Sequence, residues 1–396
     1  MKVLIFNTLY YPNIVGGAEK SVQLLAEGLV QLGIQPVIVS TAKEDKVQEV
    51  NGVKVYYLSH RNLYWGVDSK SKPSYQKMLW HGIDSHNPFM ARKVKDIIAV
   101  ERPDVIHTNN ITGLSTAPWI VARNMGIPVA HTLRDFSLMC VKSTMFKANQ
   151  NCEKRCSSCS LYTESKKRLS NQGYVHHLIG NSQFMIDRHQ HFGYFQNTPS
   201  SRIFNGAVIQ SPTLDFKKIG EKRRLKFLYM GRIEETKGVK LLLDTFQDLD
   251  NAELLLAGKV YDEQIQANLD NSKYPDHITF LGYTNPSDIL PEVDMLIAPS
   301  IWHEPLPRVI LEAYSYGKPV IGSNRGGIPE CIEEGKTGFI FDPNQPESLR
   351  SNIERIINYP NLLREMSLDL ENYLKQFNIQ RTINEYCNVY KQISNS

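Results

Sequence analysis

Residues 298–329 read APSIWHEPLPRVILEAYSYGKPVIGSNRGGIP, and this stretch decides the predicted fold. It completes an apolar run, 293–298, that is short and stops at a Pro-Ser pair, as expected of a buried parallel strand. A loop follows, then a helical pattern from Val309 that ends near Gly317, and a second apolar run begins at Pro319. This order of strand, loop, helix and strand predicts an open α/β sheet, in which ligands bind at the carboxyl ends of the strands.

Two glutamates lie in this unit, Glu304 in the predicted loop and Glu312 in the predicted helix. They can face the same crevice. A carboxylate in such a crevice suits sugar hydroxyl groups, because it accepts two or more hydrogen bonds in fixed directions. The alternative is that Glu304 stands at a helix start favoured by the macrodipole, and that Glu312 lies on a solvated helix face. Spacing alone favours this alternative.

The surroundings of the two glutamates resemble the retaining glycosyltransferases of family 4, which have the GT-B fold. The blocks that carry the resemblance are Glu304-x7-Glu312, GRIEETKG at 231–238, LLLAG at 254–258, ITFLGY at 278–283 and GGIPECIEEGKTGFIF at 326–341. Their order and spacing are far more specific than a lone glycine motif. The resemblance covers almost the whole chain and is strongest after Phe204. The narrower resemblance is to enzymes of bacterial cell-surface polysaccharide synthesis.

The resemblance implies two Rossmann-like α/β domains that face each other across a cleft, and 396 residues are enough for both. Residues 1–208 would form the acceptor-binding domain, with an insertion at 140–159 that carries a cysteine cluster. Residues 209–374 would form the nucleotide-sugar-binding domain, beginning with a polar linker at 209–224. The final helix of this fold usually returns to the first domain, so residues 375–396 are expected there.

Two cations follow the first predicted strand of the second domain. Gly231 and Arg232 follow the apolar run 225–230, and Lys237 and Gly238 open the next predicted helix. A helix N-terminus binds anions, and the two cations suit a diphosphate and the charge that develops on a leaving nucleotide. The alternative is that both cations form surface salt bridges with Glu234 and Glu235.

The resemblance also implies roles for individual side chains. Glu304, with Pro305 and Leu306 beside it, would hold the donor sugar, and Glu312 would hold the ribose. His131 is predicted to end an apolar strand at its carboxyl end, and it resembles the family histidine that reaches the donor sugar. A single histidine is more often structural than catalytic. The predicted catalytic residues are His131, Arg232, Lys237 and Glu304.

Gly16 and Gly17 lie between a predicted strand at 2–7 and an amphipathic helix at 18–32. Paired glycines suit a place where the backbone approaches another group closely, and a helix N-terminus favours anions. The spacing is not that of a dinucleotide-binding GxGxxG motif, and a simple tight turn is the alternative. The resemblance implies that this loop lies under the donor phosphate and near the acceptor.

The first half of the chain is basic. Residues 1–210 hold 24 Lys and Arg against 14 Asp and Glu, whereas residues 211–396 hold 21 against 27. This asymmetry predicts an anionic partner, such as a membrane surface or a lipid phosphate, although charge scatter and phosphate binding explain it equally well. Residues 59–90 are predicted to be irregular and are aromatic, which favours acceptor binding, with packing of a loop as the equal alternative.

Four of the six cysteines gather in one short segment: Cys140, Cys152, Cys156 and Cys159. In a cytosolic chain such a cluster is more typical of a metal or redox site than of disulfides. Four thiolates suit tetrahedral zinc, and an iron–sulfur cluster would use the same ligands. The prediction is a structural metal without an open position for catalysis, and unligated thiols are the alternative.

No apolar run approaches the roughly 18 residues of a membrane helix, and the N-terminus lacks a cleavage site. We therefore expect a cytoplasmic protein, with peripheral contact at the inner face of the membrane and no nucleic-acid partner. The predicted reaction moves a sugar from a nucleotide-sugar to a hydroxyl of a glycan or lipid-linked glycan. A UDP-sugar is the favoured donor, and a GDP-sugar is the other candidate. No metal is expected in catalysis. The alternatives are an epimerase-like enzyme of the same fold and a non-catalytic glycan-binding protein.

Overall fold

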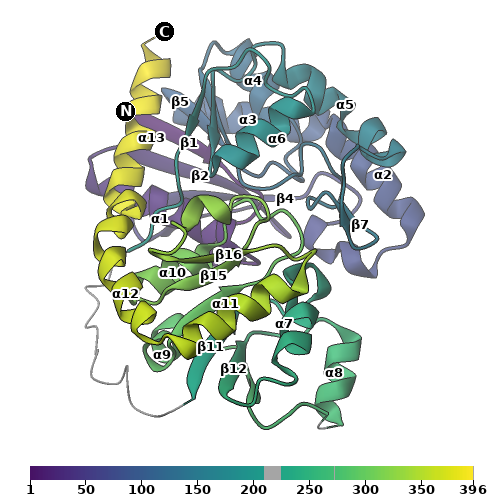
Figure 1. Ribbon diagram of the computed structural model, residues 1–396. Helices are drawn as coiled ribbons and strands as arrows, with labels where there is room; N and C mark the ends of the chain where they lie inside the picture. Colours follow the sequence, from purple (N-terminus) through teal and green to yellow (C-terminus); the bar gives the residue numbers. More distant parts are fainter. Residues whose placement is uncertain (209–223, 272, 396) are drawn as a thin grey trace. The chain divides into compact units, whose positions relative to one another are not determined.

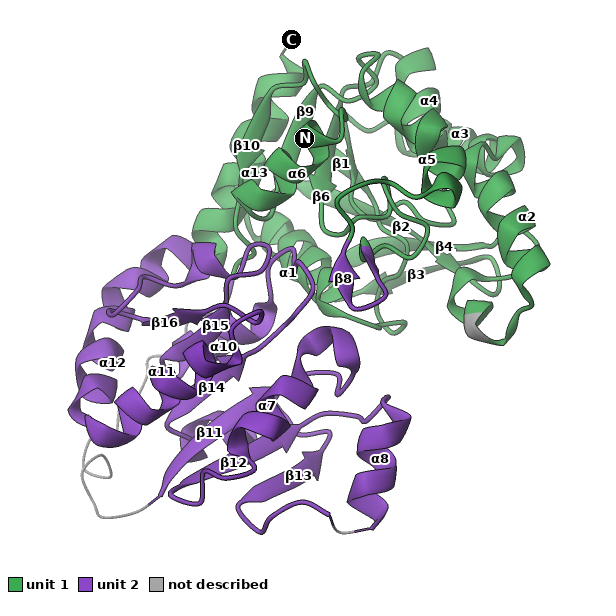
Figure 2. Cartoon of the chain, turned by 45° about the vertical axis from the view of Figure 1, so that its right-hand side comes forward, with its two compact units in different colours: residues 1–145, 152–206, 379–396 green, residues 146–151, 207–378 purple. Residues whose placement is uncertain are grey.

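The computed structural model describes residues 1–208, 224–271 and 273–395, which form two compact units (Figures 1 and 2). Unit 1 comprises residues 1–145, 152–206 and 379–396, and unit 2 comprises 146–151 and 207–378. The units therefore meet in sequence at 206/207 and 378/379, where the sequence suggested 208/209 and 374/375. Residues 209–223 of the expected linker lie outside the described residues.

Unit 1 is built on one sheet with the strand order β10-β9-β6-β5-β1-β2-β4-β3. All neighbouring strands are parallel except the β3–β4 pair at one edge, which is antiparallel. The strands are β1 (Lys2–Phe6), β2 (Gln35–Ala42), β3 (Lys46–Val50), β4 (Val53–Ser59), β5 (Val105–Thr108), β6 (Val129–Leu133), β9 (His177–Gly180) and β10 (Ser200–Arg202). The inner strands β1, β5 and β6 are buried along almost all of their length, as expected of a parallel sheet covered on both faces, although β5 and β6 also bury histidine and threonine side chains.

The helices of unit 1 are α1 (Gly17–Gln31), α2 (Ser74–Ser85), α3 (Pro88–Glu101), α4 (Ala117–Asn124), α5 (Ser157–Ser170), α6 (Gln183–His191) and α13 (Ile379–Ser394). The last helix, α13, contributes Tyr386 and Tyr390 to the hydrophobic core of unit 1. It packs on α1 (Figure 1). Gly28 makes this contact possible, because a Cβ there would lie 2.0 Å from Ile383 Cδ1. The prediction that residues 59–90 are irregular is wrong, since a 3-10 helix, η1 (Gly66–Ser71), and α2 occupy much of this range.

Unit 2 contains a fully parallel sheet with the order β13-β12-β11-β14-β15-β16. Its strands are β11 (Leu225–Met230), β12 (Ala252–Ala257), β13 (Ile278–Gly282), β14 (Met295–Ala298), β15 (Val320–Ser323) and β16 (Gly338–Phe341). The helices are η3 (Glu235–Lys237), α7 (Val239–Phe246), α8 (Glu263–Asp270), α9 (Pro286–Ile289), η4 (Leu290–Glu292), α10 (Arg308–Ser315), η5 (Pro329–Cys331), α11 (Pro346–Asn358), α12 (Asn361–Tyr373) and η6 (Leu374–Phe377). The predicted strand, helix and strand of residues 293–322 are confirmed as β14, α10 and β15. No helix in the described part of the chain is long and apolar enough to span a bilayer.

A short hairpin from the first half of the chain belongs to unit 2. It consists of β7 (Phe146–Lys147) and β8 (Gln150–Asn151), while the residues on both sides of it belong to unit 1. The hairpin is closed at its base by the N–H of Cys152, which donates to the Met145 carbonyl at 2.7 Å. The polar residues of β8, Gln150 and Asn151, therefore belong to unit 2.

Candidate functional site

Glu304 lies in the loop between β14 and α10 and is 7% exposed. Its Oε1 accepts a hydrogen bond from Ser300 Oγ at 2.9 Å and forms an ion pair with Lys237 Nζ. The Lys237 ammonium also lies 5.2 Å from the centre of the Trp302 ring, an attractive cation–π arrangement. The structure thus brings together two of the side chains predicted from the sequence, Lys237 and Glu304.

Backbone contacts hold the Lys237 segment against the loop that carries Glu304. The N–H of Ile301 donates to the carbonyl of Thr236 at 3.1 Å. Gly238 follows with φ of 71°, and a Cβ at this position would lie 1.9 Å from the Pro299 carbonyl oxygen. Glycine is required at this position, because it permits both the left-handed conformation and the close approach.

The glycine turn at 326–327 packs against the backbone of Glu304. Gly326 has φ of 63°, and a Cβ on it would lie 2.0 Å from the Glu304 carbonyl oxygen. The same carbonyl accepts a hydrogen bond from the Gly327 N–H at 2.7 Å. Two segments that are distant in sequence, 236–238 and 326–327, therefore fix the position of Glu304.

Arg232 lies just beyond the end of β11, and its side chain is half exposed. Its Nη2 lies 3.1 Å from Glu234 Oε1, so the surface ion pair considered as the alternative role is present. The guanidinium keeps further donors for an anion, because five N–H groups surround it. Burial, reinforced by the carboxylates of Glu304 and Glu234, raises the pKa of Tyr229 well above its usual value. Arg232 and Lys237 are thus each paired with a carboxylate of unit 2.

Glu312 lies on α10, and its carboxylate pairs with Arg308 rather than with Lys237. The distance from Arg308 Nε to Glu312 Oε1 is 3.8 Å, which is long for a hydrogen bond. The Glu312 side chain is 33% exposed, whereas Pro305 and Leu306 are buried in the loop before the helix. The carboxylate of Glu312 is therefore accessible to a polar ligand.

Asn151 forms two hydrogen bonds with the loop before Glu304. The sequence did not indicate this residue. Its Nδ2 donates to the Ile301 carbonyl at 2.9 Å, and its Oδ1 accepts from the N–H of His303 at 2.8 Å. The hairpin of β7 and β8 thus holds the main chain of this loop. Nothing in the local sequence around Asn151 reveals partners 150 residues away.

Gly16 and Gly17 begin α1 in unit 1, at the carboxyl end of β1. Both residues are exposed, and the N–H of Gly16 donates to Glu19 Oε2 at 3.0 Å. Burial, together with the nearby charge of Asp135, raises the pKa of Glu19. The exposed glycines leave their backbone accessible, as the predicted close approach of a ligand requires.

His131 does not end its strand, so its predicted position is wrong. The strand β6 continues to Leu133, and the imidazole of His131 is 2% exposed. Its Nδ1 is 2.8 Å from Thr108 Oγ1, and the ring packs between Trp119 and Phe195. Burial, helped by the positive fields of His189 and Arg134, lowers the pKa of His131 to about 3. The predicted donor contact of His131 stays a prediction.

Arg134 and Asp135 are the residues that lie at the carboxyl end of β6. The Arg134 guanidinium donates to Asn109 Oδ1 at 2.7 Å and to Asn205 Oδ1 at 2.8 Å. Asp135 accepts the Ser137 N–H at 2.8 Å, and burial raises the pKa of its carboxyl. A network of buried polar groups therefore occupies this edge of the sheet.

The four cysteines of residues 140–159 lie in and beside the start of α5. A hydrogen bond from the Cys159 thiol lowers the pKa of Cys140 to about 6. The N–H groups of the following loop act in the same direction, whereas burial opposes the shift. The same bond and burial raise the pKa of Cys159, which also hydrogen-bonds with Cys156. As these thiols stand, no group of three or more His, Cys, Asp or Glu side chains among the described residues is arranged to hold a metal ion. The structural zinc or iron–sulfur cluster, with Cys152 as its fourth ligand, stays a prediction.

Comparison with known proteins places this geometry in a family. The sequence model of Glycosyltransferase Family 4 matches residues 15–210, and that of Glycosyl transferases group 1 matches residues 211–375. An uncharacterized 42.6 kDa protein in the cps region of Klebsiella pneumoniae is 34% identical over 332 residues, which cover 83% of this chain and 87% of that protein. An uncharacterized glycosyltransferase of Methanocaldococcus jannaschii is 25% identical over 388 residues, covering 90% of this chain and 89% of its own.

Solved structures show the same fold. Sucrose-phosphate synthase from Thermosynechococcus elongatus superposes with a TM-score of 0.77 at 18% identity, over 99% of this chain and 98% of its own. Anabaena Alr3699/HepE in complex with UDP superposes with a TM-score of 0.72 at 18% identity, over 99% of this chain and all of its own. The chain therefore belongs to glycosyltransferase family 4, and it is a retaining glycosyltransferase of the GT-B fold that uses a nucleotide-sugar donor.

Proposed function

We propose that this enzyme moves a sugar from a UDP-sugar, with a GDP-sugar as the other candidate, to a hydroxyl of a glycan or lipid-linked glycan in capsule synthesis. The observations that carry the proposal are the Lys237–Glu304 pair and the half-exposed guanidinium of Arg232, both in unit 2. The relative encoded in a capsule region supports the choice of pathway. The protein of the same fold that was solved with UDP and with UDP-glucose supports the choice of uracil as the base.

In this proposal Arg232 and Lys237 hold the diphosphate. Lys237 has three N–H donors, so its ammonium can bind a phosphate oxygen while it stays paired with Glu304. Arg232 chelates phosphate oxygens with the donors that Glu234 leaves unused. Both cations then stabilise the charge that develops on the nucleoside diphosphate as it leaves.

Glu304 holds the donor sugar in this proposal. Its contacts with Ser300 and Lys237 are both made by Oε1, and Oε2 is the oxygen proposed to accept from sugar hydroxyls. Pro305 and Leu306 follow as the buried wall of this part of the site, and Glu312 accepts from the ribose hydroxyls. Gly16 and Gly17, whose backbone is exposed in unit 1, are proposed to contact the donor phosphate and the acceptor, as the resemblance implies.

The anomeric configuration is retained because the acceptor attacks the sugar on the same face from which the nucleoside diphosphate leaves. The bond between the anomeric carbon and the β-phosphate oxygen breaks, and the acceptor oxygen forms the new bond to that carbon. The proton of the acceptor hydroxyl passes to the departing phosphate oxygen. The protein therefore needs to supply position and positive charge rather than a dedicated base, and Arg232 and Lys237 supply that charge without a catalytic metal.

Calorimetric titration with UDP, GDP, ADP and TDP, each with and without EDTA, tests the proposal. We expect tight binding of UDP that EDTA leaves unchanged. Binding of another base, or loss of UDP affinity in EDTA, contradicts the assigned base or the metal-independent phosphate site. Conversion of the nucleotide sugar in the absence of any acceptor would indicate epimerase chemistry instead.

We further propose that unit 1 contacts the inner face of the cytoplasmic membrane from the cytoplasm. The support is the excess of basic over acidic residues in 1–210, which attracts an anionic surface. Sedimentation with lipid vesicles tests this. We expect salt-sensitive binding to anionic vesicles and none to zwitterionic vesicles, because exposed charges are screened at high ionic strength. Equal binding to both contradicts the proposal.

A further inference from the structure

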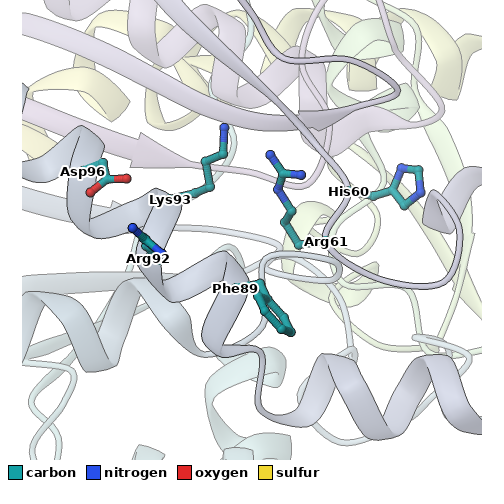
Figure 3. Close-up of a pocket in the computed structure, with 6 residues that line it drawn as sticks. All are labelled: His60, Arg61, Phe89, Arg92, Lys93 and Asp96. Carbon is teal, nitrogen blue, oxygen red and sulfur yellow. The ribbon is translucent and has the colours of Figure 1, made fainter.

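Unit 1 contains a cavity of about 500 Å³ between the end of β4 and the helix α3 (Figure 3). Its lining combines cations with an exposed aromatic ring and consists of His60, Arg61, Phe89, Arg92, Lys93 and Asp96. Phe89 is 72% exposed, so its ring adds apolar surface to the mouth of the cavity. The cavity therefore offers both positive charge and apolar surface to a ligand.

Two of the cations are held in place by one carboxylate. Asp45 Oδ2 lies 2.6 Å from Lys93 Nζ and 3.1 Å from Arg61 Nη2. Although partial burial opposes the shift, hydrogen bonds from Lys93 and Ser59 lower the pKa of Asp45 to about 2. Asp45 therefore orients both cations but neutralises only one of them.

Arg92 is the cation that the protein leaves available. Among the described residues, no carboxylate forms an ion pair with its guanidinium, although it lines the same cavity as Arg61 and Lys93. A guanidinium presents paired N–H donors that match the oxygens of a phosphate. The cavity is thus prepared for an anion of this shape.

A second cavity of about 270 Å³ continues along α3 and shares Lys93 and Asp96 with the first. Apolar side chains line it, among them Val47, Ile97 and Val100. Val47 is 54% exposed and Val100 is 70% exposed, so the groove keeps apolar surface in contact with water. Over the two cavities, four cations (Lys46, Arg61, Arg92 and Lys93) face two carboxylates (Asp45 and Asp96).

We propose that these two cavities, together the α3 groove, bind the lipid phosphate of a lipid-linked acceptor. The phosphate would occupy the cavity at Arg61, Arg92 and Lys93, and the first part of a single apolar chain would lie along Val47, Ile97 and Val100. A concave groove with a charged end and an apolar end suits one bound amphiphile, because each part of the ligand meets its complement. This inference rests on the proposed function, since it identifies the acceptor of that reaction.

The position of the groove on the sheet adds a feature of the acceptor. His60 and Arg61 follow β4, and β4 is parallel to β2, β1, β5 and β6. The carboxyl ends of these strands share one edge, and four strand spacings of about 4.8 Å place the end of β6 about 19 Å from the end of β4. If the acceptor hydroxyl reacts near His131, the residue of β6 that the resemblance assigns to the donor sugar, several sugars must separate it from the phosphate. The enzyme would therefore act on a glycan that has already been extended.

Calorimetry on the full chain with farnesyl phosphate, farnesol and inorganic phosphate tests the groove. We expect farnesyl phosphate to bind at least about tenfold more tightly than either part alone, because each cavity contributes. Arg92→Gln and Val100→Asp should each weaken binding by about tenfold, which is about 1.4 kcal/mol. Lys95→Gln is the matched control, since Lys95 is exposed on the same helix but lines neither cavity.

Three results would overturn the inference. Arg92→Gln could bind farnesyl phosphate as the Lys95→Gln control does. Farnesol could bind as tightly as farnesyl phosphate. Binding could occur only to vesicles of anionic phospholipid and equally in both variants, which would indicate contact with the bilayer. UDP affinity measured in the same proteins keeps the two questions apart, because loss of UDP binding counts against the proposed function and not against the groove.

Discussion

Lys237 and Glu304 form an ion pair that joins the segment before α7 to the loop before α10, across 67 residues of sequence. Their side chains are largely buried, so each would carry an uncompensated charge without the other. The pair also sets the direction of both groups before any donor binds. We therefore regard the proposed donor site of unit 2 as preorganised.

Removing either of the cations proposed to bind the diphosphate should slow transfer. We expect Arg232→Ala and Lys237→Ala each to lower kcat by about 100-fold, the scale for the loss of one group that stabilises developing charge. Lys240→Ala is the control, because Lys240 is exposed on α7 and its substitution removes the same charge close to Lys237 in sequence. Steady-state rates with a saturating donor measure the effect. Near-normal turnover in both variants would exclude the assigned role.

Glu304→Gln should separate sugar recognition from nucleotide binding. The amide keeps the shape of the side chain, but it removes a negative charge next to Lys237 and the proposed diphosphate. We expect transfer to fall by about 100-fold while the affinity for UDP stays equal or rises, because repulsion of the phosphates decreases. Glu312→Gln should show the opposite pattern, with weaker UDP binding through the ribose. Parallel loss of UDP affinity and transfer in Glu304→Gln would instead indicate that Glu304 only supports its loop.

The fold around Glu304 can be predicted because its local signals are strong. The strands β14 and β15 are short buried apolar runs, and Gly317 ends the intervening helical segment with φ of 67°. The helix α2 lacks such signals. Only Trp80 and Asp84 are buried along it, so the apolar period that identifies a helix is faint.

The site can be predicted only where a residue acts through its own motif. Lys237 and Glu304 stand in separate recognisable blocks, whereas the role of Asn151 depends on the docking of a hairpin onto a distant loop. His131 shows a further limit of pattern reading. A polar residue after an apolar run resembles a strand end, but this imidazole shares a hydrogen bond with the Thr108 hydroxyl inside the sheet, and the strand continues.

Asn151 should matter to the loop before Glu304 more than its distance in sequence suggests. Asn151→Ala removes two hydrogen bonds to that loop, each worth about 1 kcal/mol. We expect faster amide exchange at His303, whose N–H loses its acceptor, together with lower turnover. Gln150→Ala on the same hairpin is the control, since Gln150 is exposed and does not contact the loop through its side chain. Unchanged exchange at His303 in Asn151→Ala would show that the hairpin does not hold the loop.

Unit 1 should lose stability on acidification through its buried histidines. Burial, with the positive fields of neighbouring groups, lowers the pKa of His131 to about 3, and burial lowers that of His189 to about 4. The unfolded chain binds protons at these residues near pH 6.5, so below that pH it binds more protons than the native state. The free energy of unfolding should therefore fall as the pH drops from about 6.5 toward 4, by up to about 1.4 kcal/mol per pH unit for each histidine. Above pH 6.5 these residues should cause no dependence.

Urea unfolding followed by tryptophan fluorescence measures this dependence, because Trp119 packs directly on His131. In the His131→Gln variant the free energy of unfolding should change less per pH unit, because only one of these two buried histidines still contributes. The same variant tests the predicted donor contact. Turnover that falls more than about tenfold at pH 8, with an unchanged melting temperature, would favour a catalytic contact, since tenfold corresponds to about 1.4 kcal/mol of barrier. Unchanged turnover would assign His131 to the fold alone.

The cysteine cluster allows two states, and metal analysis distinguishes them. The backbone N–H groups of Lys142, Thr144 and Met145 point at the Cys140 sulfur and favour its thiolate, the form that binds zinc. Metal binding would require the thiol of Cys152 to join those of Cys140, Cys156 and Cys159, which already hydrogen-bond with one another. We expect about one zinc per chain in protein purified without a histidine tag, the stoichiometry of a single four-thiolate site.

Cys159→Ser should then lower both the metal content and the melting temperature, because a zinc site that forms on folding stabilises the folded state. Cys331→Ala is the control for metal content, since Cys331 lies in unit 2 and outside the cluster. Protein without zinc or iron in which all four thiols react with a thiol reagent would instead show that the hydrogen-bonded arrangement is the working one. In that case the base of the β7–β8 hairpin would depend on the Met145–Cys152 backbone bond and its packing, and the position of Asn151 would not respond to chelators.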